Sequence, residues 1–162
     1  MSVEENLRSL GIALPVAPKP AGNYQAWLTH GDLLFLSGQF PIEDGKLRFV
    51  GRIGAELTED EGYAAARLAA LNVLAQIGAA LGGFERLETL LRVEGHVASA
   101  PDWNNAPKVL DGASDLLVAV LGDRGHHTRA AFTPAQLPWN LTVELVVTAA
   151  VRPSAASIQL LS

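Results

Sequence analysis

The sequence of 162 residues contains no cysteine. This absence excludes disulfide bonds, thiolate nucleophiles and metal sites that depend on cysteine, although it does not by itself decide the cellular compartment. The first residues, Met1 to Asn6, are polar and acidic, so they lack the basic start and apolar core of a secretory signal. We therefore expect a cytoplasmic protein.

Basic residues are also few: 12 lysines and arginines stand against 17 acidic residues, and the formal net charge is -5. They are scattered along the chain, whereas a protein that binds a phosphate backbone concentrates them on one face. Nucleic acid is therefore not expected as a partner.

Long apolar runs are missing as well. No uninterrupted run approaches the roughly 20 residues that cross a bilayer, and the longest candidate, residues 141–151, is interrupted by Glu144. We therefore expect no membrane span. The length and the 49% share of hydrophobic residues suit a single domain over residues 21–152. A leader segment with three prolines (1–20) precedes it, and a tail rich in serine and alanine (153–162) follows.

The domain begins with a predicted β-hairpin. Two apolar runs, residues 24–28 and 33–37, flank His30-Gly31-Asp32, which has the composition of a turn. A second turn at Glu43-Asp44-Gly45 leads to residues 47–51, which we interpret as a short edge strand.

Two helices follow from capping residues and apolar spacing. Thr58 and Glu61 match a capping box, and apolar residues recur at helical spacing behind them until Gly82-Gly83, which favours the end of a helix. A second helical pattern runs over residues 109–121 and ends near Gly122.

Alternating residues predict strands over 87–98, 128–133 and 140–151. In the first of these, Leu91 and Val93 share the apolar side. The order of three strands, helix, strand, helix and two strands predicts an α+β fold with both helices on one face of a mixed sheet. Because the uncovered face of such a sheet often finds its cover in another subunit, we expect an oligomer.

One ionisable residue, Glu144, interrupts the otherwise apolar last strand. A carboxylate there is costly to desolvate unless it is paired, hydrogen-bonded or open to a cleft. Arg129 is the nearest cation in sequence that also lies in a predicted strand. Its planar guanidinium suits either Glu144 or a ligand carboxylate. Spacing alone leaves both readings open: a structural ion pair, or a site for a small carboxylate-bearing molecule.

Four sequence motifs extend this observation. Arg129 precedes Leu137-Pro138 by one short strand, and Glu144 follows on the next. Upstream lie Gly22-Asn23-Tyr24 and the strand end Phe35-Leu36-Ser37-Gly38-Gln39. In this order and spacing, the motifs resemble the RidA/YjgF family over residues 21–152. Three departures (Asn23 for proline, Ala131 for cysteine, Phe132 for valine) and a longer second helical segment are more similar to a longer subgroup, often labelled chorismate-mutase-like or L-PSP endoribonuclease-like.

The resemblance implies a chorismate-mutase-like fold, with a mixed sheet of about six strands and two helices on one face, assembled as a homotrimer with ligand sites between subunits. It also implies hydrolysis of reactive enamines and imines, such as 2-iminopropanoate and 2-iminobutanoate, to 2-keto acids and ammonia. Arg129 would hold the substrate carboxylate, and Glu144 would direct the attacking water from an adjacent strand. Tyr24, Ser37 and the backbone of Gly38 would line the site, without a metal or cofactor.

Other kinds of site have less support. His126 and His127 could be read as a metal pair, but adjacent side chains on a strand point to opposite faces. Ser37 could be read as a hydrolase nucleophile, but the Gly-x-Ser-x-Gly turn is missing. The leading hypothesis is an imine deaminase. The alternatives are a protein that binds a carboxylate metabolite without turnover and, with less support, an endoribonuclease or translation inhibitor.

Overall fold

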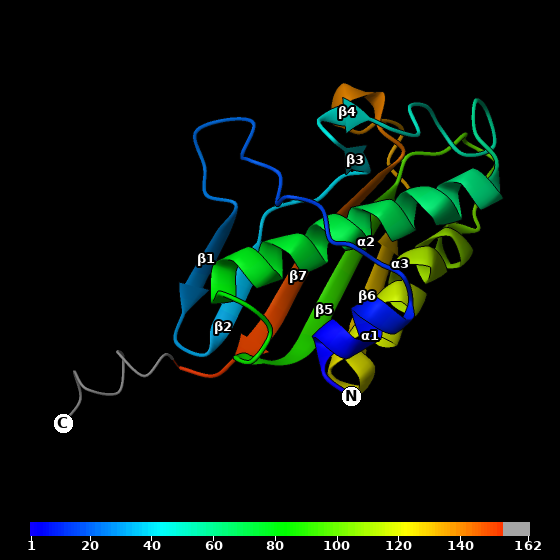
Figure 1. Cartoon of the computed structure of the whole chain (residues 1–162). Helices are drawn as coiled ribbons and strands as arrows, with labels where there is room; N and C mark the ends of the chain where they lie inside the picture. Colours follow the sequence, from blue (N-terminus) through cyan, green and yellow to red (C-terminus); the bar gives the residue numbers. More distant parts are fainter. Residues whose placement is uncertain (154–162) are drawn as a thin grey trace.

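The computed structural model describes residues 1–153. Its centre is a five-stranded sheet in the order β1-β2-β7-β5-β6 (Figure 1). Neighbouring strands are antiparallel except for β5 and β6, which run parallel. The strands are β1 Trp27–His30, β2 Leu33–Leu36, β5 Leu87–Val97, β6 Thr128–Phe132 and β7 Val143–Val151.

Two long helices, α2 (Glu59–Leu81) and α3 (Ala106–Leu121), pack on one face of this sheet (Figure 1). The short α1 (Val3–Ser9) packs against α3. The predicted α+β arrangement, with a mixed sheet and two helices on one face, is confirmed. Instead of one sheet of about six strands, the described residues form this five-stranded sheet and a separate two-stranded ribbon.

The start and end of α2 are as the sequence predicts. The Thr58 hydroxyl accepts from the Glu61 amide, and the Glu61 carboxylate accepts from the Thr58 amide. At the other end Gly82 has φ 69°, a conformation that favours glycine. The helix joins α3 closely because Gly112 of α3 lies against the Tyr63 backbone, where a Cβ would collide.

By length and composition α2 alone would qualify as a membrane-spanning helix among the described residues. Its most apolar window has a mean hydropathy of 1.5, and 61% of that window is buried inside the fold. The apolar stretch of α2 is interrupted by Arg67, Asn72 and Gln76, so this finding does not contradict the expectation that uninterrupted apolar runs of this length are missing. Its apolar residues contact α3 and β7, as those of a core helix do.

Each central strand has a buried side and an open side. In β7, residues 143, 145, 147, 149 and 151 are buried towards the helices, whereas Glu144, Val146, Thr148 and Ala150 are only partly buried. In β5 the pairing with β7 shifts between Leu90 and Arg92. This irregularity buries Leu90 and Val93 and leaves Leu91 exposed, so the prediction that Leu91 and Val93 share the apolar side is wrong.

The predicted edge strand over residues 47–51 is also wrong. The chain forms a short ribbon of β3 (Ile42–Glu43) and β4 (Lys46–Leu47) around the turn at Asp44-Gly45. It then leaves the extended conformation, because Phe49 has φ 55° and Gly51 has φ 128°.

Two buried amides on α2 hold irregular segments against the core. Asn72 donates through Nδ2 to the carbonyls of Phe40 (2.8 Å) and Ile42 (2.9 Å), and Gln76 donates to that of Pro18 (2.7 Å). The bond to Pro18 attaches the leader segment to the domain. The tail predicted over residues 153–162 lies, apart from Pro153, outside the described residues.

Candidate functional site

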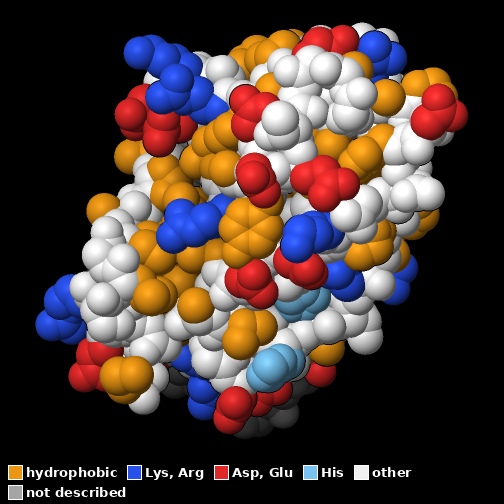
Figure 2. Space-filling view, turned by 90° about the vertical axis from the view of Figure 1, so that its right-hand side faces the viewer, with side chains coloured by type: hydrophobic (Ala, Val, Ile, Leu, Met, Phe, Trp, Pro, Cys, Tyr) orange, Lys and Arg blue, Asp and Glu red, His pale blue; other side chains and the backbone are white. Residues whose placement is uncertain are grey.

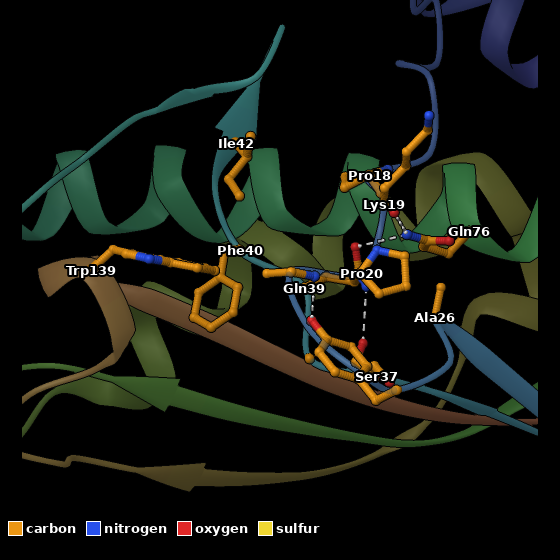
Figure 3. A pocket seen from close by; sticks show the side chains of 13 residues that line it. Pro18, Lys19, Pro20, Ala26, Ser37, Gln39, Phe40, Ile42, Gln76 and Trp139 are labelled. Carbon is orange, nitrogen blue, oxygen red and sulfur yellow. Dashed lines mark hydrogen bonds between the residues drawn. The ribbon is translucent and has the colours of Figure 1, made fainter.

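Three of the residues predicted to bind substrate lie together. Tyr24, Ser37 and Gly38 line one hollow beyond the end of β2, along with Phe40 and Trp139 (Figure 3). Its volume is ≈ 70 Å³, room for only a few atoms. Sites for small molecules usually enclose roughly 300–1,000 Å³. The hollow is therefore smaller than a usual ligand site.

The segment before β1 is fixed to the strand end. The Ser37 hydroxyl donates to the carbonyl of Gln25 (2.6 Å), and the Ser37 amide donates to that of Ala26 (3.0 Å). Tyr24 accepts through its hydroxyl from the Ala21 amide (3.1 Å) while its ring stays half exposed. These bonds set the wall of the hollow.

Gly38 and Glu144 are in direct contact. A Cβ at position 38 would overlap the Glu144 carboxylate, whose carbon would be only 2.8 Å away. The glycine is therefore required for the carboxylate to occupy this place. Gly38 also lines the hollow, so this residue connects the hollow to the Glu144 carboxylate.

The Glu144 carboxylate is half buried, and within residues 1–153 it has no hydrogen bond or salt bridge. Loss of solvation raises its pKa, and the nearby His96 opposes this only in part. His96 is its cross-strand neighbour on β5 and stacks on Phe132 of β6, with ring centroids 4.9 Å apart. An unpaired carboxylate with a raised pKa can accept a proton more readily than an ordinary one.

Arg129 has a different environment. Its Nη1 donates to Asp111 Oδ1 and to Ser114 Oγ, both at 3.0 Å, and its Nη2 donates to the Pro107 carbonyl at 3.2 Å. All three acceptors belong to α3. Of the five N–H groups of a guanidinium, two remain without a partner in the described part of the chain. With 24% of its side chain exposed, Arg129 remains accessible to a ligand.

Within one chain Arg129 and Glu144 do not meet. Arg129 pairs with Val93 of β5 and points to the helix side, whereas Glu144 pairs with His96 on the open side. The expectation that they lie on adjacent strands is wrong, because β5 lies between β6 and β7. A structural ion pair between them is equally wrong, since the partner of Arg129 is Asp111.

Ser114 links Arg129 to His127. Ser114 Oγ lies 3.0 Å from His127 Nε2, and His127 Nδ1 lies 2.6 Å from the Gly125 carbonyl. A carbonyl only accepts, so Nδ1 carries the proton and Nε2 accepts from Ser114. Burial lowers the pKa of His127, which favours this neutral form. Among residues 1–153, no group of three histidine or acidic side chains could hold a metal.

Sequence reasoning did not find Asp111 and Ser114, although helical spacing could have placed them with Pro107 on one side of α3. It also missed Gln39 and Gln76, two buried amides that contact each other near the hollow. The available signal was a polar residue, Gln76, one turn after Asn72 in an apolar helical stripe.

Comparison with known proteins agrees with this architecture. Residues 4–151 match the family model described as "YjgF/chorismate_mutase-like, putative endoribonuclease". The chain belongs to the YjgF family. Its fold class follows from the same match.

Relatives of full length support this assignment. Protein TCP17 of Trypanosoma cruzi is 42% identical over 144 residues, which are 88% of this chain and 90% of that protein. A crystal structure from Shewanella oneidensis MR-1, which carries the same endoribonuclease label, has a TM-score of 0.89 at 39% identity. The match covers 93% of this chain and 99% of that one.

Other members of the YjgF family are less similar. RidA from the Antarctic bacterium Psychrobacter sp. PAMC 21119 has a TM-score of 0.58 at 26% identity, over 83% of this chain and 93% of that one. E. coli TdcF, at 22% identity and a TM-score of 0.61 over 85% of this chain and 94% of that one, shows the shared fold alone. The chain thus resembles the Shewanella protein more than it resembles RidA.

Proposed function

We propose that this YjgF-family protein is a small-molecule hydrolase of the imine deaminase type. The observation that carries the proposal is the half-buried Glu144 carboxylate, which has no partner within residues 1–153 and contacts Gly38. Gly38 in turn lines a hollow too small to form a whole site.

We place the complete site between the subunits of a homotrimer. The open side of the sheet presents Leu28, Phe35 and Phe132, which are 61%, 41% and 45% exposed. An apolar sheet face of this kind is normally covered. Strand β6 lies at the edge of the sheet, so it is placed to meet the open side of a neighbouring subunit. Arg129 of one subunit would then face Glu144 of the next.

In this arrangement the two free N–H groups of Arg129 hold the substrate carboxylate. Glu144 takes a proton from a water molecule as the water oxygen bonds to the imine carbon, which gives a tetrahedral carbinolamine. Glu144 passes this proton to the amine nitrogen. As Glu144 then takes the proton of the new hydroxyl group, the carbon–nitrogen bond breaks, and ammonia leaves a 2-keto acid. Because the pKa of Glu144 is raised, its carboxylate is a stronger base than an ordinary one.

Hydrolysis of freshly generated 2-iminopropanoate tests the reaction. Arg129→Ala and Glu144→Gln should each lose most of the rate, and Arg8→Ala, on the exposed side of α1, should keep it. Wild-type activity in Arg129→Ala would contradict the proposal. Ligand-induced stabilisation that depends on Arg129 without any turnover would instead favour a binding protein.

Mixed trimers test the placement of the site. If each site takes Arg129 from one subunit and Glu144 from another, co-expression of the two inactive variants restores about a quarter of the wild-type rate, by random assortment in a symmetric ring. If both residues act within one chain, the mixture stays inactive. Light scattering should give three times the chain mass of 17.1 kDa.

The endoribonuclease label of the family has less support in this chain. On the face shown in Figure 2, lysine and arginine side chains alternate with acidic ones and form no continuous basic patch. An RNA-binding surface would concentrate positive charge. We therefore favour the small-molecule reaction.

A further inference from the structure

A chain of hydrogen bonds runs from the Arg129 guanidinium through Ser114 to His127. Arg129 Nη1 donates to Ser114 Oγ, which lies 3.0 Å from His127 Nε2. On the far side of the imidazole, His127 Nδ1 lies 2.6 Å from the Gly125 carbonyl. A guanidinium can only donate and a carbonyl can only accept. The two ends of the chain therefore fix the direction of every hydrogen bond between them.

This direction requires a neutral His127. With its proton on Nδ1, the imidazole leaves Nε2 free to accept the hydrogen of the Ser114 hydroxyl. The lone pairs of the hydroxyl oxygen then remain for Arg129. A serine within a helix can otherwise donate to the carbonyl one turn earlier in its own helix. His127 thus determines where the Ser114 hydrogen points.

A second proton on His127 would reverse one bond of this chain. Nε2 would become a donor, and its hydrogen-bond partner in the described part of the chain is Ser114 Oγ. The hydroxyl oxygen would then face two positively charged donors, while its own hydrogen would lose its acceptor. Protonated His127 would therefore compete with Arg129 for Ser114. Of the three acceptors of Arg129, only Asp111 and the Pro107 carbonyl would remain.

The surroundings of His127 favour its neutral form. Burial is the main reason that the pKa of His127 lies below the ordinary 6.5, and the charges of Arg129 and His126 lower it further, whereas the bond to Gly125 opposes the shift. The other charged residues on the elements around it form no ion pair with His127 within residues 1–153. They are Lys108, Asp111 and Asp115 on α3, Asp123 and Arg124 in the short helix η1 (Gly122–Gly125), and Glu88, Arg92 and Glu94 on β5.

We propose that neutral His127 is a positioning residue for Arg129, because it takes up the Ser114 hydrogen and keeps the Ser114 oxygen as an acceptor for the guanidinium. The inference rests on the proposed role of Arg129 in holding the substrate carboxylate. A guanidinium with all three acceptors is held in place before the substrate arrives. Substrate binding should therefore weaken as the pH falls through the pKa of His127, which lies below 6.5.

His127→Gln tests this dependence on pH. Glutamine does not titrate, and its amide oxygen can accept the Ser114 hydrogen. At about pH 8 the wild type and the variant should have the same KM for freshly generated 2-iminopropanoate. As the pH falls through the pKa of His127, the KM of the wild type should rise to about five times that of the variant, the loss expected for one hydrogen bond. The ratio of the kcat values should stay near one, since the lost interaction concerns binding.

The ratio of the two KM values isolates His127, because the substrate and Glu144 titrate in both proteins. His127→Phe keeps a ring but offers no acceptor, so its KM should be raised about fivefold at every pH. His126→Gln is the matched control at the adjacent, exposed histidine. Compared with His127→Gln it should keep the pH dependence of the wild type, moved towards higher pH because one positive neighbour of His127 is gone.

Nitrogen-15 spectra of the His127 ring and of the Arg129 guanidinium give a readout that needs no turnover. At about pH 8 the ring proton should lie on Nδ1. The Arg129 signals should shift with the same midpoint as the His127 ring, and this shift should be absent in His127→Gln. If no protein hydrolyses the imine while the two titrations coincide, the proposed reaction fails but the control of Arg129 by His127 stands.

Three results would each overturn the inference. They are a ring proton on Nε2 at about pH 8, a KM ratio that stays constant across the titration of His127, and a wild-type KM in His127→Phe. Should His127→Phe fail to fold, the KM ratio of the wild type and His127→Gln and the two titrations decide.

Discussion

Arg129 and Glu144 differ in how many hydrogen-bond partners the chain itself provides for their side chains. Arg129 has three acceptors, all on α3, whereas the Glu144 carboxylate has no donor within residues 1–153. A charged group with partners in its own chain is positioned before any ligand arrives. A half-buried carboxylate without partners keeps a raised pKa and can still accept a proton or a hydrogen bond. The chain thus positions the Arg129 guanidinium through its own hydrogen bonds. It leaves the Glu144 carboxylate without a hydrogen-bond partner among residues 1–153.

The largest effect is expected at Gly38. In Gly38→Ala the new Cβ displaces the Glu144 carboxylate. The free energy of unfolding should fall by about 1 kcal/mol, the low end for overpacking because a flexible side chain can move, and imine hydrolysis should be lost. Urea unfolding measures the first quantity. Adding Glu144→Ala to this variant should restore stability without restoring activity.

Gly78→Ala is the matched control for that change. A Cβ there meets only the Phe84 ring, at 3.6 Å, and alanine stabilises a helix by up to about 1 kcal/mol relative to glycine. If Gly38→Ala were as stable as Gly78→Ala, the close contact with Glu144 would be disproved.

Ser114→Ala should have the next largest effect, because it removes an acceptor from Arg129 and the donor to His127. We expect a loss of about 1 kcal/mol in the free energy of unfolding and a raised KM for the imine. Ser9→Ala, which removes one exposed bond within α1, should change stability by less than about 0.5 kcal/mol. Equal losses in the two variants would mean that Ser114 does not support Arg129.

A smaller effect, which depends on pH, is expected for Glu144→Gln. Folding raises the pKa of Glu144 above the ordinary 4.5, so the wild type loses stability as the pH rises from 4.5 through the folded pKa. Glutamine does not titrate. The Tm of the variant minus that of the wild type should therefore be larger at pH 7 than at pH 4. A difference that stays constant with pH would show that the carboxylate is well solvated.

The smallest effect is expected for Asp111→Asn. The Asp111 side chain is 52% exposed, so its ion pair with Arg129 is screened and should contribute about 0–1 kcal/mol. Urea unfolding at low and high salt measures it. A loss much larger than this at high salt would show that Arg129 depends on Asp111 more than on Ser114.

Much of the fold could be predicted from local patterns. Thr58 and Glu61 locate the start of α2, and alternation around Glu144 identifies β7 and its two sides. The failure at residues 47–51 arises from Phe49, whose positive φ no apolar pattern reveals. Leu91 is exposed for a similar reason, because an irregular pairing breaks the alternation of β5.

The site was harder to predict than the fold. Spacing in the sequence groups Arg129, Leu137-Pro138 and Glu144 into one motif. It does not reveal that β5 lies between β6, which carries Arg129, and β7, which carries Glu144. The register of strand pairing decides which face of the sheet a side chain points to, and this register depends on pairing between segments far apart in the chain. The α3 partners of Arg129 depend on tertiary packing in the same way.

The Asn72 amide, which holds the carbonyls of Phe40 and Ile42, makes an irregular loop part of the cooperative unit. The backbone N–H of Gln39, at the start of this loop, donates to the Leu145 carbonyl of β7 (2.8 Å). The loop cannot leave the sheet without breaking bonds to a buried helix and a central strand. The backbone N–H of Gln39 should therefore exchange its hydrogen only through global unfolding, as slowly as the amides of the core and more slowly than those of a surface loop.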